Sequence, residues 1–304
     1  MIKLIVLYIF FILFKKMSLH KQDQHKLPQV YLKKFGYLDK SNQWKVSVIN
    51  RKEKFTRQKS IESFTAVTNI FDINSSDPRI QRIFEELNCD LETEYNNIIG
   101  DLINKQKLSI KSNAYLLQLI GNLMIRSDYW REWTLGMLKH KNKENFLQII
   151  LGHNCKDEAE FLNIKKLPFY RILADGSPDE IINRVLLYLV DYFMLRLWHY
   201  EIVILESQED KLWFTSNNPV VVHNRILRNE IFAKESELYF PLSPKYLAYV
   251  HFKGSEDKKN PLRTFKKNVD HKAKDDQIEF LTKIILDNQA EFLIIPLRLN
   301  YRID

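Results

Sequence analysis

Two short segments of the sequence combine residue types that can carry out chemistry. In the first, His25 lies three residues before Pro28, and the aromatic residues Tyr31 and Phe35 follow at a spacing of four. A histidine near neutral pH can act as a general base, a metal ligand or a nucleophile. Alternatively, His25 is a buried hydrogen-bonding side chain that pins the N-terminal segment onto the core.

The second segment runs from Trp213 to Pro219 and reads Trp-Phe-Thr-Ser-Asn-Asn-Pro, which predicts a strand that ends in a polar turn. Ser216 could act as a nucleophile only beside a base and an oxyanion hole, and no glycines flank it to form a nucleophile elbow. Asn217 and Asn218 are candidate polar ligands to a substrate. The alternative is a turn capped by its own side chains.

Most other signatures of chemistry are absent from the sequence. There is no glycine-rich phosphate loop and no His-Glu-x-x-His motif, and the chain has only seven glycines. Cys89 and Cys155 have no spacing typical of metal ligands. We therefore predict no metal site and reduced thiols, as in a cytoplasmic protein, with a single Cys89–Cys155 disulfide as the less favoured alternative. The sequence specifies no cofactor.

The positive charge is concentrated at the N-terminus. Residues 1–60 hold fourteen Lys and Arg against three Asp and Glu, whereas the remaining 244 residues hold 32 basic and 35 acidic side chains. Such a segment could attract the phosphates of nucleic acid or an anionic membrane surface. A general excess of lysine, from a bias in base composition, would give the same count.

An unbroken apolar run of eleven residues, Leu4–Phe14, lies between Lys3 and Lys15. A helix needs about 20 apolar residues to cross a bilayer, so this run is too short to span one alone. If it inserts, its basic C-terminal flank keeps the rest of the chain on the inner face of the membrane. Alternatively, Met17 is the native start. We therefore divide the chain into an apolar stub, 1–16, and a single domain, 17–304.

The pattern of the remaining chain predicts a helix-rich α+β fold, with long central helices and a small, mostly antiparallel sheet from the C-terminal half. Asp77-Pro78 and the capping box from Ser177 to Glu180 are strong helix starts. The apolar period changes from 3.6 to 2 near residue 200. We expect helices over 79–105, 110–140, 177–199 and 275–288, shorter helices within 144–166, and strands over 44–49, 201–207, 212–215, 220–222, 239–240, 246–252 and 292–295. The pair 201–207 and 212–215 is expected to form a hairpin, the rest of 17–60 to be irregular, and 253–274 to be a loop.

The two segments resemble a family of unknown function, DUF4238. Its opening pattern, His-x-x-Pro-x-Phe/Tyr-Leu-x-x-Phe, is matched by His25, Pro28, Tyr31, Leu32 and Phe35. Its central pattern, Thr-Ser-Asp-Asn-Pro, is matched by Thr215, Ser216, Asn218 and Pro219, and a third, Phe-Pro-Leu-Ser-Pro, by Phe240, Pro241, Leu242, Ser243 and Pro244. The resemblance covers nearly all of residues 20–296.

The resemblance also implies roles for residues between these motifs. Glu92 and Arg126 stand where the family has a Glu and an Arg, which could clamp an anion or form an ion pair between helices. Asn217 replaces the family's Asp. If that Asp were a catalytic base or a metal ligand, Asn217 would impair the site, because an amide cannot take up a proton. If it only caps a turn, Asn serves equally well.

We assign candidate roles as follows. The candidate catalytic residues are His25, Ser216 and Asn217; the candidate ligand-binding residues are Tyr31, Glu92, Arg126 and Asn218; the residues with a structural role in the motifs are Pro28, Phe35, Pro219, Pro241 and Ser243. The set favours a hydrolase acting on phosphate esters or nucleic acid. Two alternatives remain open. One is a non-catalytic module that binds nucleic acid or a protein partner, for example in defence against mobile elements; the other is an effector tethered to the membrane by Leu4–Phe14.

Overall fold

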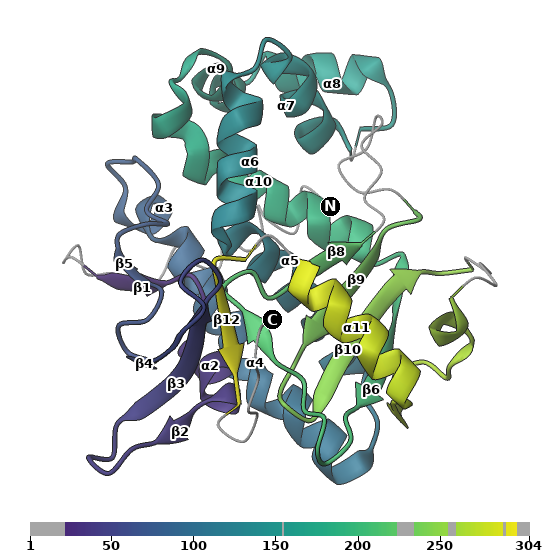
Figure 1. Cartoon of the computed structure of the whole chain (residues 1–304). Coiled ribbons are helices and arrows are strands. Elements are labelled where there is room, and N and C mark those ends of the chain that lie inside the picture. Colours follow the sequence, from purple (N-terminus) through teal and green to yellow (C-terminus); the bar gives the residue numbers. More distant parts are fainter. Residues whose placement is uncertain (1–21, 154, 224–233, 255–259, 288–289, 297–304) are drawn as a thin grey trace.

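Three long helices form the centre of the computed structural model, which describes residues 22–153, 155–223, 234–254, 260–287 and 290–296 (Figure 1). They are α4 (Ile83–Lys105), α5 (Ile110–Arg126) and α10 (Pro178–Leu197). The shorter helices are α2 (Gln29–Phe35), α3 (Pro78–Gln81), α6 (Asp128–Lys139), α7 (Lys143–Gly152), α8 (Glu158–Lys165), α9 (Pro168–Asp175) and α11 (Asp275–Asp287). Both predicted helix starts are confirmed, because the Asp77 side chain accepts from the Arg79 N–H and Ser177 forms a capping box with Glu180.

The segment predicted as one helix over 110–140 is two helices, α5 and α6. The chain is extended at Ser127, whose hydroxyl donates to the Met124 carbonyl at 2.7 Å. This bond satisfies a carbonyl at the end of α5, and Asp128 in the first turn favours a new helix start. Apolar periodicity continues across the break, so the sequence pattern alone did not show it.

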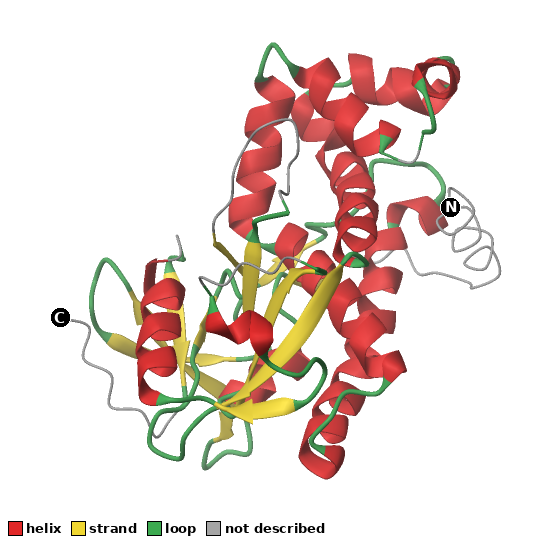
Figure 2. Cartoon of the chain, turned by 90° about the vertical axis from the view of Figure 1, so that its right-hand side faces the viewer, coloured by secondary structure: helices red, strands yellow, loops and turns green. Residues whose placement is uncertain are grey.

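A five-stranded sheet lies between the long helices and α11. Its order is β11 (Asp270–Lys272), β6 (Tyr200–Glu206), β10 (Tyr246–Phe252), β9 (Glu237–Pro241) and β8 (Val221–His223). All its pairs are antiparallel except β11 with β6. Ile202 and Ile204 pack into the core shared with the helices, and Val203 and Leu205 into the core shared with α11. Figure 2 shows the strands between these two layers. This architecture confirms the α+β fold.

A second sheet joins distant parts of the sequence. Its order is β2 (Tyr37–Leu38), β3 (Trp44–Asn50), β12 (Phe292–Ile295) and β7 (Thr215–Ser216), and β4 (Thr56–Ser60) pairs with β3. A separate two-stranded sheet pairs β1 (Asp23–His25) with β5 (Ala66–Thr68). The prediction that 17–60 is irregular apart from one strand is therefore wrong, because this segment also contains α2 and the strands β1, β2 and β4. The 253–274 loop likewise includes a 3₁₀ helix (Pro261–Thr264) and β11.

The predicted hairpin of 201–207 with 212–215 is wrong. β6 pairs with β10 and β11, whereas β7 pairs with β12. Trp213 and Phe214 are buried in the core that contains α11. Trp213 stays close to β6 through its indole N–H, which donates to the Leu205 carbonyl at 3.2 Å, but its own backbone N–H donates to Pro244. Burial of two large aromatic side chains thus directs this segment away from a ladder with β6.

The apolar run Leu4–Phe14 and both candidate start residues, Met1 and Met17, lie outside the described residues. Among the helices of the described ranges, none is long and apolar enough to cross a membrane.

Candidate functional site

His25 is fixed at the end of β1 by the turn that follows β4. Its Nε2 lies 2.8 Å from the Glu62 carbonyl, so Nε2 carries the hydrogen and donates it. The Gln29 side-chain amide also lies 3.3 Å from Nε2. The neighbouring backbone is held because the Lys26 N–H donates to the Thr65 carbonyl at 3.1 Å. With this tautomer, Nδ1 carries the lone pair and has no hydrogen-bond partner among the described residues, which is the arrangement that a general base requires.

Arg126 joins the first motif to two helices. It lies at the end of α5 with only 3% of its surface exposed. Its Nη1 donates to Glu92 of α4 at 2.8 Å, and its Nη2 donates to the backbone carbonyl of His25. Its guanidinium also lies 5.8 Å from the centre of the Phe71 ring. Glu92 and Arg126 therefore form an ion pair between helices, and the same guanidinium positions His25.

A second carboxylate, Glu85, lies in this cluster. Glu85 is half-buried, two helical turns before Glu92 on α4, and makes no side-chain hydrogen bond or ion pair with the described residues. Burial raises the pKa of Glu85, and the negative charge of Glu92 adds to this, while the nearby Arg126 and His25 lower it in part. A carboxyl group with a raised pKa beside a histidine is a common feature of acid–base sites.

Two buried N–H groups of the cluster lack partners. The Asn88 side-chain oxygen accepts from Asn122 at 2.9 Å, but the Asn88 Nδ2 has no hydrogen-bond partner in the described part of the chain. The same holds for the Nε of Arg126. A buried donor left unpaired costs about 1–3 kcal/mol, so a polar ligand or a water that accepts from these groups would be stabilised here.

The second motif forms a closed turn. The Ser216 hydroxyl donates to the Asn218 carbonyl at 2.7 Å and accepts from the Asn218 N–H at 3.1 Å. The Asn217 side-chain oxygen accepts from the Phe292 N–H at 2.9 Å, and the Asn217 N–H donates to the Phe292 carbonyl at 3.1 Å. These contacts place Asn217 between β7 and β12, where an Asp carboxylate would accept the same hydrogen bond. Neither bond of the Ser216 hydroxyl is to a base.

Tyr31 connects the three motifs. Its fully buried hydroxyl donates to the Pro241 carbonyl at 3.0 Å and lies 2.5 Å from the Thr215 hydroxyl. Its ring stacks on Phe240 at a centroid distance of 5.4 Å and meets Phe35 edge-on. Burial raises the pKa of Tyr31 far above its usual range, so the phenol stays neutral.

The remaining motif residues lie at the ends of elements. Pro28 precedes the first residue of α2, and Pro241 is the last residue of β9. The Ser243 hydroxyl accepts from the Tyr246 N–H at 3.1 Å, which closes the turn between β9 and β10. Pro219 is buried directly after Asn218.

The structure thus brings together some of the predicted residues. His25, Glu92 and Arg126 meet through direct contacts, whereas Ser216 makes no bond to any of them. The two groups are joined through Tyr31, which lies six residues after His25 and whose hydroxyl is 2.5 Å from that of Thr215, the residue before Ser216. Glu85 and Asn88 were missed. Asn88 lies three residues after Glu85 and four before Glu92, which places all three on one face of α4, but this spacing does not distinguish them from solvated side chains. No cluster of three or more His, Cys, Asp or Glu side chains suited to a metal occurs in the described ranges.

The comparisons with known proteins identify the family of this chain. Neither the curated proteins nor the solved structures contain a protein that matches this chain. The sequence profile of a family described as "Protein of unknown function (DUF4238)" matches residues 23–294, and the chain therefore belongs to this family.

Proposed function

We propose that this protein hydrolyses phosphodiester bonds of single-stranded nucleic acid, with His25 and Glu85 as its acid–base pair. The observation that carries the proposal is the convergence on Arg126 of the His25 backbone carbonyl, which it binds, and of the Glu85 carboxyl group, whose pKa is raised by burial and lowered in part by the charge of Arg126. Nδ1 of His25 and the Glu85 carboxyl group have no hydrogen-bond partner among the described residues. Nδ1 of His25 takes the proton of the attacking water or hydroxyl. Glu85, whose pKa is raised by burial, gives a proton to the leaving oxygen.

The phosphoryl group has donors to bind. Arg126 Nε and Asn88 Nδ2 are two buried N–H groups of this cluster that have no hydrogen-bond partner among the described residues. Hydrogen bonds from such fixed donors stabilise charge that develops on a phosphoryl oxygen in the transition state. The hydrogen bond from Arg126 to the His25 carbonyl fixes the position of the imidazole relative to these donors.

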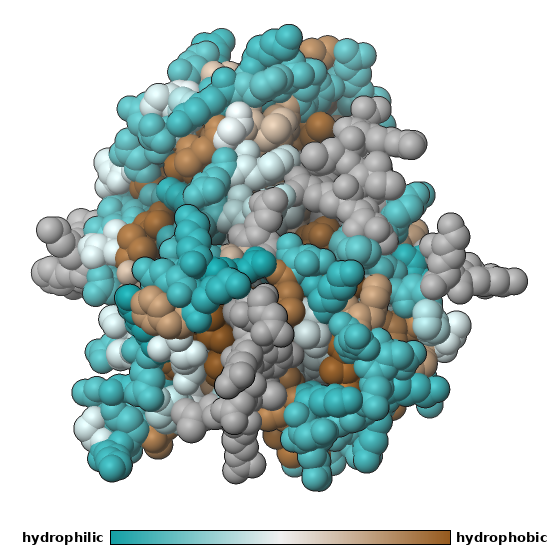
Figure 3. All heavy atoms as spheres, in the orientation of Figure 1, coloured by the Kyte–Doolittle hydropathy of each residue, from teal (hydrophilic) through white to brown (hydrophobic). Residues whose placement is uncertain are grey.

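The neighbouring surface supports a single-stranded nucleic acid as substrate. Trp44 and Phe55 are 36% and 44% exposed, with Lys33 above the ring of Trp44 at 5.9 Å and Arg57 above that of Phe55 at 4.4 Å. Exposed aromatic rings beside cations are stacking platforms for unpaired bases. These residues lie around β3 and β4, on a face where Figure 3 shows mostly hydrophilic side chains (lower left). The turn that follows β4 contains Glu62, and the Glu62 backbone carbonyl accepts the hydrogen bond from His25.

The same surface favours a second candidate, a module that binds single-stranded nucleic acid without cleaving it. That candidate needs Trp44 and Phe55 but not the acid–base pair. It therefore predicts binding that is independent of His25 and Glu85.

A cleavage assay with short fluorescent RNA and DNA single strands tests both candidates. We expect cleavage by the wild type and a loss of about 100-fold or more in His25→Ala and in Glu85→Gln, in keeping with acid–base catalysis. His271→Ala is the matched control, because the Nε2 of His271 likewise bonds a backbone carbonyl, that of Lys266, at 2.9 Å. Salt-sensitive binding without cleavage would support the second candidate instead, and equal losses in the control variant would contradict the proposal.

A further inference from the structure

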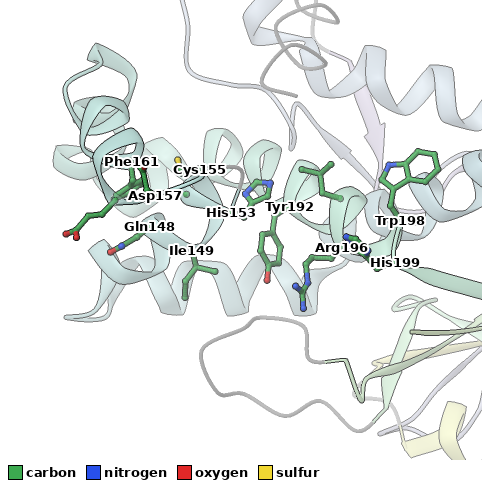
Figure 4. A pocket seen from close by; sticks show the side chains of 13 residues that line it. Gln148, Ile149, His153, Cys155, Asp157, Phe161, Tyr192, Arg196, Trp198 and His199 are labelled. Carbon is green, nitrogen blue, oxygen red and sulfur yellow. The ribbon is translucent and has the colours of Figure 1, made fainter. Parts of the chain in front are cut away.

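A large open cavity lies away from the candidate site, between α7, α8 and α10 (Figure 4). Its volume is about 1070 Å³, and none of the motif residues lines it. Volumes of this order are typical of sites for small organic ligands and cofactors. The cavity was not indicated by the sequence, because its walls come from three helices that read as ordinary amphipathic segments.

One part of the cavity is basic. Arg196, His153 and His199 line it, and Lys253 lies just beyond, with its ammonium donating to the Trp198 carbonyl at 2.8 Å. Burial lowers the pKa of His153, and the positive charge of the nearby Arg196 lowers it further. The Nδ1 of His153 lies 2.8 Å from the Ile150 carbonyl, so Nε2 carries the lone pair when the ring is neutral, and Nε2 lies 3.9 Å from the Asp191 carboxylate. A protonated ring would therefore be paired with Asp191, and Arg196 and His199 are the basic groups that an anionic ligand would meet.

Three aromatic side chains, Phe161, Tyr192 and Trp198, also line the cavity, together with the carboxylates Asp157 and Glu158. Tyr192 packs edge-on against His153 with ring centroids 5.2 Å apart, and Phe161 lines the other end beside Asp157 (Figure 4). Trp198, at the basic end, is 49% exposed although it is the largest side chain type. An exposed indole beside cations can stack on a flat aromatic ring.

We infer that this cavity binds a nucleoside phosphate, with its phosphate at Arg196 and His199 and its base against Trp198. A wholly apolar ligand would offer no acceptor to Arg196 or His199. An inorganic anion would fill only a small part of 1070 Å³ and would not use the exposed indole of Trp198. A molecule that carries both a phosphate and an aromatic ring can contact both the basic side chains and the indole of Trp198. This inference does not rest on the proposed hydrolase function.

Calorimetric titration of the full chain with AMP, adenosine and inorganic phosphate tests the inference. We expect saturable AMP binding that is at least tenfold tighter than binding of either fragment. Arg196→Gln and Trp198→Leu should each weaken AMP binding about tenfold or more, since one charged contact or one stacked base is lost. Arg171→Gln, an exposed arginine on α9, is the matched control and should leave the Kd unchanged.

A second measurement guards against variants that fail to fold. In the wild type, NMR titration of His153 should show its pKa rising when AMP is bound, because the phosphate offsets the charge of Arg196. Absence of saturable AMP binding, binding of adenosine or phosphate as tight as that of AMP, or an unchanged pKa of His153 would each overturn the inference.

Discussion

Replacing Tyr31 with Phe removes one hydroxyl from the point where the three motifs meet. Because the Tyr31 hydrogen is donated to the Pro241 carbonyl, the hydrogen between Tyr31 and Thr215 comes from Thr215. The variant leaves two buried groups unsatisfied, the Pro241 carbonyl and the Thr215 hydroxyl. Each costs about 1–3 kcal/mol, so we expect the free energy of unfolding to fall by about 2–4 kcal/mol, with ring packing against Phe240 retained.

Urea denaturation of a double-mutant cycle measures this effect. Thr215→Val alone should cost less than Tyr31→Phe, because the phenol keeps its bond to Pro241, and the two changes should couple by about 0.5–3 kcal/mol. Tyr115→Phe is the matched control, because the hydroxyl of this half-buried tyrosine makes no hydrogen bond within the described residues, and should stay within about 0.5 kcal/mol. A cost for Tyr31→Phe no larger than that of the control, or additive effects in the cycle, would refute the role given to this hydroxyl.

Three further outcomes follow from local contacts. Asn217→Asp should keep stability within about 1 kcal/mol in urea denaturation, since a carboxylate still accepts from the Phe292 N–H, whereas Asn217→Ala should lose about 1 kcal/mol. Burial and the cation of Lys267 lower the pKa of His251 to about 4, below its ordinary value of 6.5. The unfolded chain therefore binds more protons between these values, and stability should fall as pH decreases from about 6.5 to about 4, less steeply in Lys267→Met. Ser177→Ala should cost about 1 kcal/mol by thermal or urea unfolding, through loss of the capping box of α10.

Local signals in the sequence predicted much of the fold. Asp77 and Ser177 mark helix starts because their side chains satisfy backbone N–H groups within three residues, which involves no distant partner. The strands of the main sheet were found because both of its faces are buried, so that Tyr246–Phe252 is an almost continuous apolar run. These features depend only on neighbours along the chain.

Pairing between distant segments could not be predicted in the same way. β12 lies between β3 and β7, which joins residues near 48, 215 and 294 in one sheet. A strand of four residues carries no information on its partner, and the proximity of 201–207 to 212–215 favoured a hairpin that burial of Trp213 prevents. The break at Ser127 was missed for a related reason, since a single side-chain bond to Met124 decides it.

The candidate site was predictable only through the family resemblance. Periodicity and charge give no reason to place His25 beside Arg126 and Glu92, and their meeting depends on how α4, α5 and β1 pack. Glu85 was missed because a glutamate on an amphipathic helix is most often a solvated side chain. Only its partial burial and its neighbours in space distinguish it.

The positions of the motif residues suggest why the family pattern combines polar and aromatic residues so far apart in sequence. The carbonyl of His25 is held by Arg126, and six residues later Tyr31 is bonded to Thr215 and Pro241. The segment from β1 to α2 is therefore fixed at both ends, at one by the helices and at the other by the two sheets. A histidine that acts as a base must be held to within a fraction of an ångström. A substitution at Tyr31 that leaves the protein folded should consequently lower the activity of His25 without touching it, an effect seen in kcat rather than in substrate affinity.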